Sequence, residues 1–137
     1  AAVGLYKGDV WSQTFQYVRP QETGNKTDVR WMAVSNGKIG LMAKGLPKFD
    51  ASVHQYPYKD LDHVRYGQKH GKLDIQPKDQ VDWLIDYKQM GVGGDNSWGA
   101  RPHKQYTLTP KVYNYSFLLI PFEERTDLTQ LSNLSLN

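Results

Sequence analysis

A glycine-rich segment at residues 90–99 carries the residue types best suited to binding a ligand. It reads MGVGGDNSWG. Its glycines allow backbone angles that are closed to other residues, so the chain can turn sharply here. These residues are Gly91, Gly93 and Gly94. Three short polar side chains that can bind the amides of the turn follow directly: Asp95, Asn96 and Ser97. The segment therefore predicts a tightly specified loop that ends on a large aromatic residue, Trp98.

Two interpretations of Trp98 follow from this loop. A sugar can stack its apolar C–H face on an aromatic plane while nearby polar groups bind its hydroxyls. Alternatively, Trp98 is a core residue that happens to follow a turn, which is the more common situation for tryptophan. A phosphate-binding loop fits poorly, because the segment lacks the Lys-Ser/Thr pair that such loops use.

A second segment, residues 17–31, is dense in hydrogen-bonding groups and reads YVRPQETGNKTDVRW. Pro20 and Gly24 should end a strand and form a loop there. Its charged side chains could form an ion-pair cluster that fixes the loop. The residues of that cluster are Glu22, Asp28 and Arg30. The loop is either a contact surface for substrate or another domain, or a solvated loop with local ion pairs.

Composition excludes several classes of protein. The 137 residues suffice for one domain, and the lack of cysteine excludes disulfides, thiolate zinc sites and cysteine nucleophiles. The net charge of +3 comes from scattered basic residues, which gives weak support for nucleic acid binding, and no apolar run is long enough for a membrane helix. Only three of the fourteen acidic residues are glutamates, so a self-sufficient glycosidase with two glutamates is not expected. The four histidines show no metal-binding spacing.

Alternating polar and apolar residues predict an all-β chain that positions these loops. Strands are expected at residues 13–18, 29–33, 39–43, 81–87 and 112–120. Asn36-Gly37 predicts a hairpin in which both turn residues have positive φ. One short helix is expected at residues 58–66, and residues 123–137 form a polar tail that either moves freely or docks on a partner outside this chain. The pattern is typical of an antiparallel β-sandwich.

The two segments together also carry a family resemblance. Residues 17–31, followed by DYKQMGVGGDNSWGARP at residues 86–102, resemble the C-terminal, small-chain domain of glycoside hydrolase family 2 β-galactosidases. The resemblance covers about residues 3–122. It implies the C-terminal half of a galactose-mutarotase-like supersandwich, whose complete domain is about twice as long. The sequence departs from the family at Asn96, where members often have a second aspartate.

The resemblance implies a non-catalytic role within a larger enzyme. The catalytic glutamates of the family lie on a TIM-barrel domain, and its magnesium and sodium ligands also lie on other domains, so this chain is expected to hold no catalytic residue, metal or cofactor. Trp98 maps onto a tryptophan that stacks on the sugar, and the glycines and polar residues before it shape that loop. Contacts to other domains are expected from Arg19, Glu22, Asp28, Arg30 and Arg101.

Several partners and alternatives accompany this expectation. The expected partners are the other domains of the parent enzyme and a galactoside substrate such as lactose, within a homo-oligomer, with no nucleic acid and no membrane. The compartment stays open between bacterial cytoplasm and periplasm. Two other functions remain open: a free-standing carbohydrate-binding module, and a purely structural or assembly domain.

Overall fold

The structure, a computed structural model, describes residues 2–15, 23–61, 75–96 and 98–135. Its strands are β1 (Lys26–Ser35), β2 (Ile39–His54), β3 (Asp82–Asp86) and β4 (Ser116–Glu123). Its helices are all short: η1 (Trp11–Gln13), η2 (Tyr58–Leu61), η4 (Lys104–Tyr106) and α1 (Leu128–Ser132). The chain divides into two compact units, and β2 continues from one into the other. One unit holds residues 1–26 and 51–85, and the other holds residues 27–50 and 86–137.

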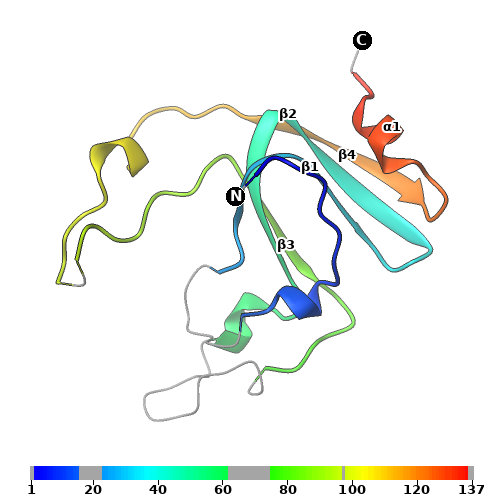
Figure 1. Ribbon diagram of the computed structural model, residues 1–137, viewed down its shortest axis with the longest axis horizontal. Coiled ribbons are helices and arrows are strands. Elements are labelled where there is room, and N and C mark those ends of the chain that lie inside the picture. The colour runs from blue at the N-terminus through cyan, green and yellow to red at the C-terminus, as the bar shows by residue number, and fades with distance from the viewer. Residues whose placement is uncertain (1, 16–22, 62–74, 97, 136–137) are drawn as a thin grey trace. The chain divides into compact units, whose positions relative to one another are not determined.

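The strands form one sheet built around β2 (Figure 1). The order is β1-β2-β3, and β4 also pairs with β2, in antiparallel register from Ile39↔Glu123 to Leu46↔Ser116. This arrangement confirms the all-β, antiparallel class that the alternating residues predicted, with a sandwich-like sheet and few helical residues. The strand expected at residues 81–87 is present as β3.

The β1–β2 hairpin is confirmed, but its turn differs from the predicted one. Gly37 has a φ of +86°, whereas Asn36 is not in the left-handed region. Instead, the Asn36 side-chain oxygen accepts the amides of Lys38 (3.0 Å) and Ile39 (3.1 Å). Three residues therefore connect the strands, and only the glycine needs a positive φ.

The unit that holds residues 27–50 and 86–137 has its core on β2. Met42, Ala43 and Phe49 are buried there. Gly40 has no side chain because the Phe122 ring from β4 lies over it: a Cβ there would come within 2.2 Å of the ring. Strand β4 runs from Ser116 to Glu123. It begins four residues later than the strand that the alternating residues predicted at 112–120.

Residues before β4 form an aromatic row rather than a strand. The Tyr87 ring lies 5.5 Å from that of Tyr113 and 5.8 Å from that of Tyr115, and Tyr115 continues to Phe117 at 6.0 Å. Ring pairs at these distances are favourable beyond the area they bury. The row holds the segment that leads into β4 against the segment that follows β3.

The other unit has a small core of its own. Tyr56 and Ile75 are buried, and Trp11 packs against them. The strand expected at residues 13–18 is wrong at residues 13–15, where η1 ends and the chain continues without strand pairing, and residues 16–18 lie outside the described residues. Of the helix expected at residues 58–66, the described part is η2, a single turn.

The polar tail contains a helix that the sequence analysis missed. The Asp127 carboxylate accepts the amides of Thr129 (2.9 Å) and Gln130 (3.1 Å), which is the usual way an aspartate starts a helix. The resulting α1 has one and a half turns, too short for a periodic apolar pattern to reveal. Lys44 of β2 donates a hydrogen bond to the Leu134 carbonyl just after α1, so this end of the chain docks on its own sheet.

Candidate functional site

The glycine-rich segment lies in a long excursion between β3 and β4. Figure 1 shows the chain leaving β3 in green, turning back and returning through η4, in yellow, toward β4. The outgoing and returning parts are joined where the Gly91 amide donates to the Tyr106 carbonyl at 2.9 Å. We call residues 89–107 the Trp98 loop. Its two parts are held by contacts between them and not by strand pairing.

Two glycines of the Trp98 loop, Gly91 and Gly94, allow close packing. A Cβ on Gly94 would lie 2.5 Å from the Arg101 carbonyl oxygen and 2.6 Å from that of Ala100, too close for any side chain. A Cβ on Gly91 would approach Tyr106 and Pro102 at 3.2 and 3.3 Å. Gly93 has open space around it. None of these three has positive φ, contrary to the expected reason for their presence; in this loop positive φ occurs at Gly99 (+99°).

Polar side chains close the tip of the loop. The Asn96 side-chain oxygen accepts the amides of Trp98 (2.9 Å) and Ala100 (3.4 Å). The Asp95 carboxylate contacts Nε2 of His103 with both oxygens, at 2.8 and 2.9 Å. Ser97, the third expected polar residue, lies outside the described residues. Asn96 thus fixes the turn through its side-chain oxygen.

Trp98 projects from this tip into solvent. Its side chain is 92% exposed, which excludes a core position for it within this chain. An exposed indole presents a flat apolar face of the kind that stacks on a sugar ring. The Asn96 bond to its amide restricts the backbone that carries it.

The base of the loop rests on a buried carboxylate that sequence reasoning missed. Asp50 of β2 is 8% exposed, and its oxygens accept the amides of Asp28 and Gln89, each at 3.1 Å. Asp28 has a φ of +55°, which a residue other than glycine rarely adopts. The sequence offers one signal for this role: Asp50 stands between Phe49 and Ala51, and a carboxylate that is buried there requires hydrogen-bond donors.

The comparisons with known proteins agree on one family. The family described as "Beta galactosidase small chain" matches residues 1–119. The chain belongs to the β-galactosidase small-chain family.

Relatives of this small-chain segment are much longer proteins. A "Beta-galactosidase" from Priestia megaterium is 41% identical over 123 residues, which cover 88% of this chain and 11% of that protein. One from Alteromonas mediterranea is 34% identical over 100 residues, covering 73% of this chain and 8% of its own length. One from Vibrio vulnificus strain CMCP6 is 28% identical over 121 residues, covering 88% and 11%. The chain thus spans about a tenth of the length of these curated relatives.

The expected contact residues of the small-chain segment fall into three groups. Arg19 and Glu22 lie outside the described residues. Asp28 pairs with Lys48 at 3.3 Å and not with Arg30, so the described part of the expected ion-pair cluster does not form. Arg101 is exposed, and its carbonyl packs over Gly94.

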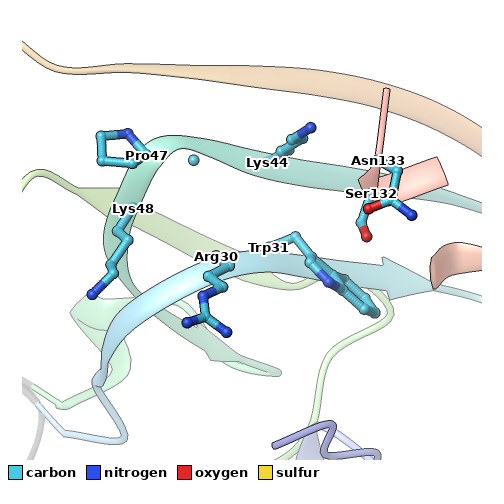
Figure 2. Close-up of a pocket in the computed structure, with 8 residues that line it drawn as sticks. Arg30, Trp31, Lys44, Pro47, Lys48, Ser132 and Asn133 are labelled. Atoms are coloured by element: carbon cyan, nitrogen blue, oxygen red, sulfur yellow. The ribbon is translucent and has the colours of Figure 1, made fainter. Parts of the chain in front are cut away.

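Arg30 lines a cavity of about 320 Å³ beside β2 (Figure 2). The other lining residues are Trp31, Lys44, Gly45, Pro47, Lys48, Ser132 and Asn133. Figure 2 shows Arg30 and Lys48 extending to one side of β2 and Lys44 to the other. Lys44 and Lys48 are also engaged by the Leu134 carbonyl and the Asp28 carboxylate. The three cations therefore do not converge on one ligand.

The part of the small-chain segment that the structure describes has neither a metal-binding cluster nor a membrane-spanning helix. There, no three histidine or acidic side chains group as a metal ion would require, and no helix has the length and apolar character to cross a membrane. Burial lowers the pKa of Lys26, whose ammonium donates to the Gly24 carbonyl at 3.0 Å. Lys26, whose pKa is lowered, lies at the start of β1 and not in the Trp98 loop.

Proposed function

We propose that this small-chain segment is a non-catalytic part of a β-galactosidase, in which Trp98 stacks on the galactoside substrate. The observation that carries the proposal is the 92% exposed Trp98 side chain on a loop held by buried and polar contacts. A rigid backbone under an exposed indole lowers the entropy cost of binding. The long relatives named "Beta-galactosidase" support the substrate class.

The loop contributes stacking and leaves hydroxyl recognition to other groups. Among the described residues, the polar side chains that precede Trp98 most closely are Asn96 and Asp95, whose oxygens already bind loop amides and His103. These oxygens serve first to hold the loop in shape. We therefore assign the hydrogen bonds to the galactose hydroxyls to the remainder of the parent polypeptide.

The catalytic carboxylates also belong to that remainder. Glycoside hydrolysis uses two carboxyl groups, one on each side of the scissile bond. Of the three glutamates, Glu22 lies outside the described residues, and Glu123 and Glu124 follow one another at the end of β4, away from the Trp98 loop in sequence. The proposal also includes contacts to other domains of the enzyme, made through Arg19, Glu22, Asp28, Arg30 and Arg101. It assigns the magnesium or sodium ligands of the enzyme to those other domains.

The proposal is tested by separating the parent polypeptide at the start of this chain. We expect little hydrolysis of a chromogenic β-galactoside by either piece alone, and recovered activity when both pieces are produced in the same cells. The reason is that the catalytic groups and Trp98 then meet in one assembly. A matched control carries Trp98→Ala in the small-chain piece, which should assemble equally well but bind substrate more weakly.

Two results would contradict the proposal. Hydrolysis by the small-chain piece alone would require a carboxylate pair within it. Quenching of tryptophan fluorescence by millimolar lactose in that piece alone, absent in Trp98→Ala, would keep the contact between Trp98 and the sugar. It would contradict the dependence on the parent enzyme and favour an independent carbohydrate-binding module.

A further inference from the structure

We infer that Asp50 is a positioning residue that joins the entry of β1 to the Trp98 loop. The inference rests partly on the proposed function, because its kinetic consequence is expressed through Trp98. Its structural consequence, the order of the loop, stands independently. Every residue that carries the argument belongs to the unit of residues 27–50 and 86–137.

The geometry assigns one oxygen of Asp50 to each segment. Oδ1 accepts the Asp28 amide at 3.1 Å, and Oδ2 accepts the Gln89 amide at 3.1 Å. The residue is 8% exposed, so solvent competes little for these bonds. Hydrogen bonds to a buried charged acceptor are stronger than those between neutral groups.

The first amide belongs to a backbone position that needs support. Asp28 has a φ of +55°, a conformation that its neighbours must stabilise. The bond from its amide to Asp50 and the ion pair of its side chain with Lys48, at 3.3 Å, hold it from two directions. Asp50 and Lys48 both belong to β2, so the entry to β1 is fixed by the strand beside it.

The second amide belongs to the first residue of the Trp98 loop. Gln89 lies two residues before Gly91, whose own amide binds the Tyr106 carbonyl. The side chain of Gln89 also reaches the Asp86 carboxylate, at 3.4 Å. The bond to Asp50 therefore fixes the point at which the loop leaves the sheet. The bond between Gly91 and Tyr106 and the bond between Asn96 and Trp98 then hold the rest of the loop relative to that point.

Both bonds require a carboxylate at this position. Two amide donors approach two different oxygens, and neither oxygen has a hydrogen to donate in return. An asparagine offers one oxygen and turns an NH₂ group toward the other amide, so it keeps one bond and loses the second. An alanine loses both and leaves two amides without acceptors.

The test measures hydrogen exchange and substrate kinetics on the full-length polypeptide that carries this chain. The variants are Asp50→Ala, Asp50→Asn and a control, Met42→Ala. Met42 lies on the same strand with 0% exposure, so its truncation destabilises the core but leaves both Asp50 bonds in place. Comparing exchange at temperatures equally far below each variant's Tm removes the effect of global stability.

We expect Asp50→Ala to speed amide exchange in residues 86–107 by about tenfold or more relative to Met42→Ala. Asp50→Asn should give an intermediate increase. The KM for a β-galactoside should rise with little change in kcat, and the rise should vanish when Trp98→Ala is already present. Equal exchange in Asp50→Ala and Met42→Ala would overturn the inference.

The two readouts separate this inference from the proposed function. Faster exchange in Asp50→Ala, with the KM unaffected by either Asp50→Ala or Trp98→Ala, supports positioning by Asp50 and contradicts sugar stacking by Trp98. A raised KM in Trp98→Ala, with exchange in Asp50→Ala equal to the control, keeps the stacking proposal and overturns the role of Asp50.

Discussion

Two glycine-containing turns in this chain are built in opposite ways. The hairpin turn at residues 36–38 is held mainly by contacts within four residues: Asn36 accepts two amides just after it, and Gly37 supplies the positive φ. One contact comes from farther along the chain, where the Glu124 amide donates to the Lys38 carbonyl at 2.8 Å. The Trp98 loop depends on contacts from elsewhere, including Asp50, which is 39 residues before Gln89. The conformation of the hairpin turn is therefore set largely by its own sequence, whereas the Trp98 loop also depends on the sheet from which it leaves.

Gly37 and Gly94 are required for different physical reasons. Gly37 has nothing near its missing side chain and is needed for its backbone angle. Gly94 has an ordinary backbone angle and is needed for space, since carbonyl oxygens lie within 2.6 Å of where its Cβ would be. A change at the first site should affect stability alone, and a change at the second should affect the presentation of Trp98.

The largest effect is expected from Gly94→Ala in the full-length polypeptide. The added methyl meets backbone oxygens that cannot rotate away, so the two parts of the loop must separate. We expect a cost of about 1–3 kcal/mol, typical of forced overpacking, seen as a raised KM for a β-galactoside and faster proteolysis within residues 89–107. Steady-state kinetics and limited proteolysis provide the measurements.

Gly93→Ala is the matched control for this prediction. It makes the same chemical change one residue earlier, where nothing lies within 4 Å of the new methyl. We expect a KM within about twofold of the unmodified enzyme, because exposed substitutions without new contacts change little. Similar losses in both variants would show that loop flexibility, and not the close approach at Gly94, controls substrate binding.

A smaller effect, confined to stability, is expected from Gly37→Ala. A φ of +86° is unfavourable for any residue with a side chain, and the cost should be about 1–2 kcal/mol. Thermal unfolding of the full-length polypeptide measures it, and the KM should stay unchanged. A KM change as large as that of Gly94→Ala would mean that the hairpin also shapes the site.

Local patterns predicted the parts of the fold that are locally determined. The alternation around Trp83 gave β3, and Asn36-Gly37 gave the hairpin, although its turn has three residues and one positive φ. The start of β4 was predicted too early, because Tyr113 and Tyr115 alternate with polar residues as strand residues do. Their backbone lies outside the sheet, and their rings pack on Tyr87. Alternation cannot distinguish a sheet face from an aromatic row.

The position of Trp98 at the tip of a loop was predicted from the sequence, but the contacts that support the loop were not. The glycine and polar residues before Trp98 left two interpretations open, a presented aromatic and the more common core residue, and the family resemblance favoured the first. Asp50 was missed because its partners, the amides of Asp28 and Gln89, come from segments that only folding brings together. The ion pair between Asp28 and Lys48 was missed for the same reason, since the candidates considered were neighbours in sequence.

The affinity of a non-hydrolysable thiogalactoside for the full-length enzyme tests the role of Trp98 most directly, because a dissociation constant isolates binding from the later steps that enter KM. Titration calorimetry would compare the unmodified enzyme with Trp98→Ala, and with Trp98→Phe as a variant that keeps an aromatic face. We predict a loss of about 1–2 kcal/mol for Trp98→Ala, or about 5- to 30-fold in Kd, and partial recovery for Trp98→Phe. Equal Kd values for all three proteins would contradict the assignment of Trp98 to the sugar.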